Sequence, residues 1–148
     1  MKLVINKCYG GFGLSHEAMM EYAKLKGIKL YAYIEKIREW AKITAVKVKD
    51  EYRKYSPKIS PNTFTVIHYC TRPLKNKNDK VTLNKYYMAD RDIKRDDPDL
   101  VKVVEKLKKR AWGFYSELKI VTIPDGTDYT IEEYDGTEWV AEKHETWG

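Results

Sequence analysis

The chain has 148 residues, of which 34% are charged and 43% hydrophobic, and its net charge at pH 7 is +6. This length suffices for one domain with a hydrophobic core that needs no disulfides. No apolar run approaches the ~18 residues of a membrane span, and the first apolar run is too short for a signal peptide. The two cysteines form no C-x-x-C pair, which favours buried thiols in a reducing compartment. These features predict a cytoplasmic protein without a membrane partner.

The charge is distributed unevenly along the chain. Residues 29–85 contain fourteen Lys and Arg against five Asp and Glu, whereas residues 86–148 contain ten against fifteen. A basic middle followed by an acidic C-terminal part indicates either an anionic partner or association between the two parts. The alternative is that a Lys-rich surface only keeps the protein in solution.

The N-terminal part combines a strand, a glycine-rich loop and a helix. Residues 1–8 are typical of a buried strand, and Ser15 is a favourable N-cap for a helix over 16–26 that ends at Gly27. The loop between strand and helix reads Gly10-Gly11-Phe12-Gly13-Leu14-Ser15.

This glycine loop is the first candidate binding site. Backbone N–H groups that point outward at a helix N-terminus are suited to a phosphate or a carboxylate. The loop departs from the dinucleotide fingerprint, because His16 stands where the third glycine is required, and it also lacks the Gly-Lys-Ser/Thr of a P-loop. The alternative is a tight turn that needs glycine for positive φ angles.

The middle of the chain predicts a basic amphipathic helix over residues 34–55. Apolar residues recur there every three or four positions, and Lys and Arg occupy the other face. Residues 43–48 also fit a strand. The Ser-Pro pairs at 56–57 and 60–61 end the helix, so we expect a basic helical insertion at about 29–62.

The remaining elements predict an α+β protein that forms a single domain over residues 1–148. The run Asp96-Asp97-Pro98-Asp99 begins a helix, with an Asp cap and proline in the first turn, and the buried stripe of this helix reaches Gly113. Turn signals at 75–80, Asp125-Gly126 and Asp135-Gly136 separate strands expected at 64–70, 81–88, 118–123, 129–132 and 138–141. We expect a mixed, mostly antiparallel sheet of about five or six strands with two or three helices.

A second candidate site follows the expected strand 81–88. Tyr86 and Tyr87 are adjacent, so they face opposite sides of a sheet and one of them is available to stack on a base. Arg91 and Arg95 carry planar guanidinium groups suited to phosphate. The alternative is a turn in which Arg91 forms local ion pairs with its acidic neighbours.

The C-terminal segment offers a weaker acid/base pair, Glu142 and His144. The alternative is a polar tail whose tryptophans cover the core or a subunit contact. The three histidines have no zinc-site spacing, and the chain has no G-x-S-x-G motif. We therefore predict binding without catalysis, with no catalytic residue, metal or cofactor.

Three sequence blocks resemble a family of small phage and prophage proteins. The blocks are Lys2–Ser15, the segment from Asp90 to Val101, and the segment from Ile131 to His144. They cover about 40 residues and leave 29–85 uncovered. The resemblance implies the cytoplasm of an infected host and supplies no catalytic residues.

These observations lead to one hypothesis and two alternatives. We expect an oligomeric phage protein that sequesters a phosphorylated, or cyclic, nucleotide signal of host defence without cleaving it, a sponge that serves immune evasion. The first alternative is an inhibitor that binds nucleic acid or a host protein through the basic helix 34–55, and the second is a small nucleotide hydrolase that uses Glu142 and His144. The expected ligand-binding residues are Asn6, Lys7, Gly10, Gly11, Gly13, Ser15, Tyr86, Tyr87, Arg91 and Arg95.

Overall fold

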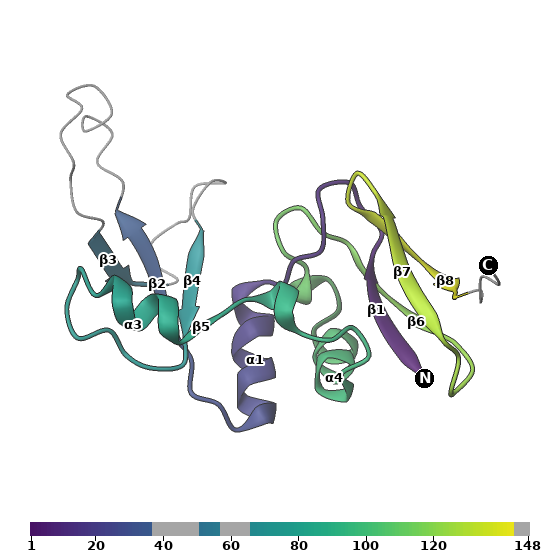
Figure 1. The fold of residues 1–148 in the computed structure, drawn as a ribbon, viewed down its shortest axis with the longest axis horizontal. Helices are drawn as coiled ribbons and strands as arrows, with labels where there is room; N and C mark the ends of the chain where they lie inside the picture. Colours follow the sequence, from purple (N-terminus) through teal and green to yellow (C-terminus); the bar gives the residue numbers. More distant parts are fainter. Residues whose placement is uncertain (37–50, 57–65, 144–148) are drawn as a thin grey trace, which may run out of the picture. The chain divides into compact units, whose positions relative to one another are not determined.

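A computed structural model of the chain describes residues 1–36, 51–56 and 66–143 (Figure 1). The α+β class is confirmed, because these residues form eight strands in three antiparallel sheets together with three α-helices. The chain divides into two compact units. Unit 1 comprises Met1–Gly27 and Asp90–Gly148, and unit 2 comprises Ile28–Ala89.

Unit 1 contains two small antiparallel sheets. Strand β1 (Lys2–Asn6) pairs with β6 (Leu118–Thr122), so that Ile5 lies opposite Lys119. Strands β7 (Tyr129–Tyr134) and β8 (Thr137–Glu142) form a hairpin, and β8 lies beside β1 (Figure 1). The strands expected at 1–8, 118–123, 129–132 and 138–141 are confirmed, with ends shifted by a few residues.

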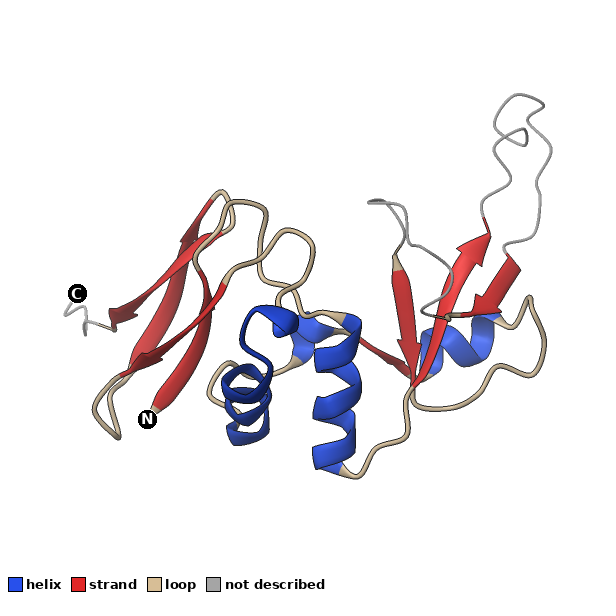
Figure 2. Ribbon diagram, turned by 180° about the vertical axis from the view of Figure 1, so that it is seen from behind, coloured by secondary structure: helices blue, strands red, loops and turns tan. Residues whose placement is uncertain are grey.

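The two long helices of unit 1 lie side by side, as Figure 2 shows in blue. Helix α1 (His16–Lys26) begins at Ser15, whose side chain accepts a hydrogen bond from the Ala18 N–H. It ends at Gly27, which adopts a left-handed φ of +69°. Both predicted caps are confirmed, because capping depends on residues within one helical turn.

Helix α4 (Pro98–Leu107) follows the 3₁₀ turn η1 (Asp90–Asp92) and continues into η2 (Lys108–Ala111). The Asp97 carboxylate accepts a hydrogen bond from the Asp99 N–H, and proline occupies the first turn, as predicted. Within the described ranges, no helix is both long and apolar enough to cross a membrane.

The core of unit 1 is formed where β1 meets α4 and the hairpin. Residues 3–6 are all buried, because α4 and β8 both contact this strand. The largest fully buried hydrophobic side chains of unit 1 come from β1, α1 and α4: Leu3, Val4, Ile5, Met19, Leu100 and Val103.

Unit 2 is a four-stranded antiparallel sheet with one short helix. Its strand order is β3 (Glu51–Lys54), β2 (Tyr31–Lys36), β4 (Ile67–Cys70) and β5 (Tyr87–Met88). Helix α3 (Lys80–Lys85) contributes one buried side chain to the core of the unit. The members of this core are Tyr33, Tyr52, Cys70 and Leu83.

Two predictions about this part of the chain are wrong. The expected helix 34–55 is a strand at both described ends, 34–36 and 51–54, and residues 37–50 lie outside the described residues. The apolar positions there fit a period of two as well as one of 3.6, and antiparallel pairing of β2 with β3 and β4 favours the strand. Unit 2 interrupts unit 1 in the sequence, as the expected insertion does, but extends from Ile28 to Ala89.

The expected strand 81–88 is also a helix over most of its length. The Asp79 carboxylate accepts a hydrogen bond from the Thr82 N–H and caps α3, so residues 80–85 are helical and β5 is left with two residues. The sequence around Asp79 contains this cap, but a strand was predicted because the segment 75–80 resembles a hairpin loop.

Candidate ligand-binding site

The glycine loop lies against the turn of the β7–β8 hairpin. The Gly10 N–H donates to the Asp135 carbonyl at 3.2 Å. A Cβ atom added to Gly136 would lie 2.6 Å from the Gly10 nitrogen and would also collide with that of Gly11. The first half of the loop is therefore in direct backbone contact with the hairpin.

The second half of the loop is bonded to η1, η2 and the segment after η2. The Leu14 N–H donates to the Asp90 carboxylate at 3.0 Å, and the Gly13 carbonyl accepts from the Gly113 N–H and the Ser116 hydroxyl. The Ser15 N–H donates to the Ala111 carbonyl at 2.9 Å. Three backbone N–H groups that were predicted to face an anion, those of Gly10, Leu14 and Ser15, therefore donate hydrogen bonds within the chain. A ligand would have to compete with these bonds.

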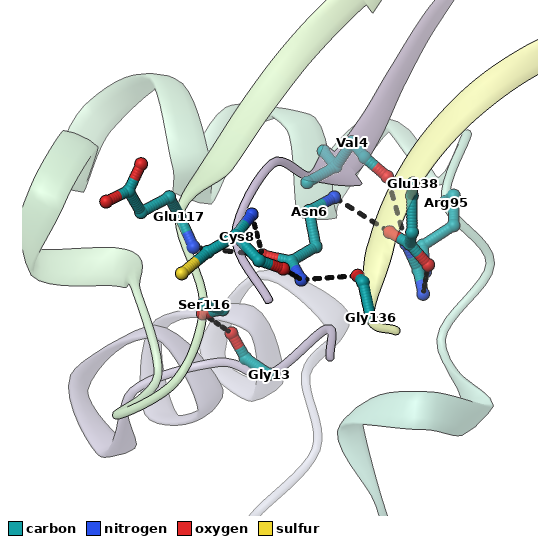
Figure 3. A network of polar contacts seen from close by, with 9 residues as sticks. All are labelled: Val4, Asn6, Cys8, Gly13, Arg95, Ser116, Glu117, Gly136 and Glu138. Carbon is teal, nitrogen blue, oxygen red and sulfur yellow. Dashed lines mark hydrogen bonds and ion pairs between the residues drawn. The ribbon is translucent and has the colours of Figure 1, made fainter. Parts of the chain in front are cut away.

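The side chain of Asn6, the last residue of β1, forms hydrogen bonds to the segment before β6 and to the hairpin turn (Figure 3). Its side chain is fully buried, and its Nδ2 donates to the carbonyls of Cys8 and Gly136, both at 2.7 Å. Its Oδ1 accepts from the N–H groups of Cys8 and Glu117. The amide group is satisfied on both sides, which explains why a polar residue is buried at this position.

Arg95 is paired with an acidic residue of the hairpin (Figure 3). Its guanidinium donates to both carboxylate oxygens of Glu138, at 2.6 and 2.9 Å, and also to the Val4 carbonyl. It lies 3.5 Å from the centre of the Phe12 ring. By contrast, the exposed Arg91 side chain has no hydrogen bond or ion pair to the described residues, so of the two arginines it is the one whose charge is unpaired.

The predicted site residues belong to both units. Tyr86 and Tyr87 are in unit 2, where the half-buried Tyr86 lies under Arg72 and the Tyr87 ring is 6.2 Å from that of His68. The other predicted residues are in unit 1. Within unit 1, the structure brings Asn6, the glycine loop and Arg95 into one network.

A groove of about 460 Å³ is lined by residues of the β1–β6 sheet, of the β7–β8 hairpin and of the segment that connects them. This volume lies within the usual range of small-molecule sites, about 300–1,000 Å³. Its lining includes the buried or half-buried aliphatic residues Ile5, Val121, Ile123 and Val140, and the polar residues Lys7, Lys119, Thr127, Tyr129 and Glu142.

The two lysines of this groove lie on one face of the β1–β6 sheet. Lys119 is opposite Ile5, and the Lys7 N–H donates to the Glu117 carbonyl, so side-chain alternation places both ammonium groups on the side of Ile5. Both side chains are exposed, and neither has an ion pair with the part of the chain that the structure describes. The groove therefore carries two positive charges without ion pairs, together with the Glu142 carboxylate, beside an aliphatic surface.

Tyr129 and Glu142 line the groove from the hairpin. The two residues are directly opposite each other in the β7–β8 register, so they share a face. Burial, and then the negative charge of Asp96, raise the pKa of the Tyr129 hydroxyl. This hydroxyl stays protonated at neutral pH and can donate a hydrogen bond.

Lys7 is the only groove residue that the sequence predicted as a ligand contact. Lys119 and Tyr129 were missed because their proximity to Lys7 requires the pairing of β1 with β6 and the packing of the hairpin. Lys119, Val121 and Ile123 are spaced two residues apart, so a strand places all three side chains on one face. This spacing is the signal in the sequence that could have grouped Lys119 with the aliphatic residues of the groove.

Exposed aromatic residues gather at three adjacent loops of unit 1. The loop 8–13, the segment 112–117 and the turn 134–137 are in contact, because Gly10 packs against Tyr115 and bonds to Asp135. Four aromatic side chains of these loops are more than half exposed: Tyr9, Phe114, Tyr115 and Tyr134. We refer to these four residues as the aromatic surface.

The acid/base pair predicted near the C-terminus is described only in part. Glu142 lines the groove, whereas His144 lies outside the described residues. Among residues 1–36, 51–56 and 66–143, no group of three or more His, Cys, Asp and Glu is placed to hold a metal ion.

Comparison with known proteins gives no match to a family model, a curated protein or a solved structure. The resemblance to phage and prophage proteins therefore stays a prediction from the sequence.

Proposed function

We propose that the protein binds a phosphorylated nucleotide in the groove between the β1–β6 sheet and the β7–β8 hairpin, and that it does not cleave the nucleotide. The observation that carries the proposal is the pair of unpaired lysines, Lys7 and Lys119, beside an aliphatic surface. A nucleotide combines these two properties, because its phosphates are anionic and its base is planar and largely apolar.

Each part of the groove has a role in this proposal. The ammonium groups of Lys7 and Lys119 contact phosphate oxygens, and Ile5, Val121 and Val140 pack against the base. The Tyr129 hydroxyl and the Glu142 carboxylate supply one donor and one acceptor for the polar edge of the base or for a ribose hydroxyl.

The cellular role that we propose rests on the resemblance to phage proteins. A phage protein that holds a nucleotide signal of host defence in the host cytoplasm would suppress that defence, and a homo-oligomer would increase the number of sites. Sequestration requires tight binding, with a Kd near 1 nM or about −12 kcal/mol. Cyclic di- and trinucleotides and cyclic ADP-ribose isomers are the first compounds to test.

Thermal unfolding tests the proposal with these cyclic compounds and with linear mono- and dinucleotides. At one hundred times its Kd, a ligand stabilises the folded protein by about 2.7 kcal/mol, which is a readily measured rise in Tm. For a compound that raises Tm, calorimetric titration should give at least a tenfold weaker Kd for Lys7→Gln and for Lys119→Gln. Lys102→Gln is the matched control, because Lys102 is an exposed lysine on α4 without an ion pair in the described residues.

Two outcomes would contradict the proposal. One is the absence of stabilisation by every compound, and the other is an unchanged Kd in the Lys7 and Lys119 variants, which would exclude the groove. Recovery of the ligand after denaturation separates binding from turnover. An intact ligand supports sequestration, whereas a hydrolysed one supports the alternative in which Glu142 and His144 act as acid and base.

The aromatic surface favours a second candidate function, binding of a host protein. Tyrosine and phenylalanine are enriched at protein interfaces. Single exposed hydrophobic residues are common on protein surfaces, but four exposed aromatic residues on adjacent loops form a patch, and such patches mark interaction sites. The basic helix 34–55 first assigned to this role is not a helix at its described ends. A photo-crosslinking residue at position 134 should capture one defined host protein in infected cells, and the same residue at position 102 should not.

A further inference from the structure

The described acidic residues of unit 2 form ion pairs or hydrogen bonds with other residues of the same unit. The Glu51 carboxylate is 3.6 Å from the Lys77 ammonium, and the Glu35 carboxylate is 3.8 Å from the His68 ring nitrogen. The Asp79 carboxylate accepts from the N–H groups of Lys75 and Thr82. In the described part of the unit, eight Lys and Arg side chains are exposed, so positive charge predominates on that surface: Lys29, Arg53, Lys54, Arg72, Lys75, Lys77, Lys80 and Lys85.

Three of these cations lie over tyrosine rings. The Lys29 ammonium is 5.5 Å from the centre of the Tyr31 ring. The Arg72 guanidinium and the Lys85 ammonium are 5.1 and 5.5 Å from the centre of the Tyr86 ring. All three cationic side chains are exposed, and none has a carboxylate partner in the described part of the chain.

The cation–tyrosine pairs lie at one end of the sheet. Tyr31 is opposite Cys70 in the β2–β4 pairing, and the next residue along, Thr71, donates its N–H and its hydroxyl to the Tyr86 carbonyl. Lys29 lies two residues before Tyr31, and Arg72 lies two residues after Cys70, so both follow the chain out of the same end of the β2–β4 pair.

Both tyrosines also pack against the same buried core of unit 2. We call this set the cation–tyrosine surface: Lys29, Tyr31, Arg72, Lys85 and Tyr86.

We propose that the cation–tyrosine surface binds single-stranded nucleic acid. Single strands present phosphates and unpaired bases at alternating positions, and cations interleaved with tyrosine rings contact both. Arginine also stacks on bases through its guanidinium plane. A duplex hides its base faces and an acidic protein segment has none, so neither uses the tyrosines. This surface belongs to unit 2, and the proposal does not depend on the groove of unit 1.

Fluorescence anisotropy with labelled twelve-nucleotide dT and rU strands tests the proposal on the full chain. The triple variant Lys29→Gln, Arg72→Gln, Lys85→Gln should bind at least tenfold more weakly. The slope of log Kobs against log salt should become less negative by about 2, because each phosphate contact on a single strand contributes about 0.7. Tyr86→Leu should weaken binding at least threefold and leave the salt slope unchanged.

The control triple variant Lys24→Gln, Lys102→Gln, Lys109→Gln removes the same charge from exposed positions in unit 1. It should bind the strands within twofold of the unaltered protein. Lys7→Gln with Lys119→Gln should also leave strand binding unchanged, so failure of the nucleotide groove and failure of this surface are distinguishable. Circular dichroism melting confirms that each variant is folded.

Three results would overturn the proposal. Unchanged affinity in the Lys29, Arg72 and Lys85 variant would exclude the surface. Equal affinity for a twelve-base-pair duplex would indicate binding to phosphate charge alone. Equally effective competition by poly-glutamate would indicate an acidic protein partner, because that polymer offers charge without bases.

Discussion

Arg95 and Glu138 form a two-point ion pair in unit 1, with N–O distances of 2.6 and 2.9 Å. The Glu138 side chain is only 7% exposed, and its Oε1 also accepts the Asn6 N–H at 2.7 Å. The pair joins the segment before α4 to strand β8, and Phe12 of the glycine loop lies on the guanidinium. This contact therefore fastens three distant segments of the chain.

Removal of Arg95 should destabilise unit 1 strongly. Arg95→Met leaves the Glu138 charge buried without its cationic partner, while the Asn6 N–H still donates to it, and we expect a loss of about 3 kcal/mol in the free energy of unfolding. Urea unfolding measures this loss. Arg95→Met with Glu138→Gln should recover part of it, because glutamine keeps an acceptor for Asn6 without a charge. Equal losses in the single and double variants would contradict a role for the charge.

Gly136 should not tolerate a side chain. It has a φ of +90°, and a Cβ atom would lie 2.6 Å from the Gly10 nitrogen. Gly126→Ala is a matched control, because Gly126 has a φ of +78° and open space at the Cβ position. We expect about 1 kcal/mol of destabilisation from the control and at least about 2 kcal/mol more from Gly136→Ala, measured by thermal unfolding. Similar losses in both would mean that the loop moves away from the hairpin at little cost.

Asp97 should make the stability of unit 1 sensitive to acid. Burial opposes its ionisation, but hydrogen bonds from the Tyr22 hydroxyl, the Lys26 ammonium and the Asp99 N–H together hold the pKa of Asp97 below its usual range. Because the pKa is lower in the folded state, the ionised carboxylate stabilises the fold at pH values above the pKa of the unfolded state. This contribution is lost as the pH falls through the pKa of the folded state. The difference in unfolding free energy between the unaltered protein and Asp97→Asn should shrink as the pH falls below about 4.

Tyr22 should have the opposite dependence at alkaline pH. Burial, and then its hydrogen bond to Asp97, raise the pKa of the Tyr22 hydroxyl to about 12. Because the pKa is higher in the folded state, the protonated hydroxyl stabilises the fold at pH values below the pKa of the unfolded state, which is near 10. This contribution to stability disappears as the pH rises to about 12. Tyr22→Phe should therefore lose less stability than the unaltered protein between these values. Parallel curves would show that Tyr22 does not titrate differently in the two states.

Features that depend on neighbouring residues could be predicted from the sequence. Ser15 caps α1 as predicted, an aspartate caps α4 as predicted, and the turn at Asp135-Gly136 joins two strands as predicted. The helix expected over 34–55 failed at its described ends for the opposite reason. Its apolar spacing is compatible with two periods, and the choice between them is made by pairing of β2 with β3 and β4.

In the candidate site too, features set by neighbouring residues could be predicted, and features set by long-range contacts could not. Lys7 could be named from its place beside the glycine loop, but its neighbours Lys119 and Tyr129 come from β6 and β7. The loop itself was predicted as an open receptor for an anion, and the structure places the Asp135 carbonyl and the Asp90 carboxylate on its amides. A backbone amide carries no sequence signal for a partner that lies many residues away.

By itself, the sequence determined the α+β class, the caps of α1 and α4 and the tight turns at Gly126 and Gly136, because caps and turns depend on φ preferences and on hydrogen bonds within about four residues. The tertiary structure alone decided that Arg95 is bound by a residue 43 positions away and that Asn6 bonds to one 130 positions away. It also decided that the groove charges of Lys7 and Lys119 lie together. Which charges are neutralised and which stay available to a ligand depends on segments that meet only when the chain has folded.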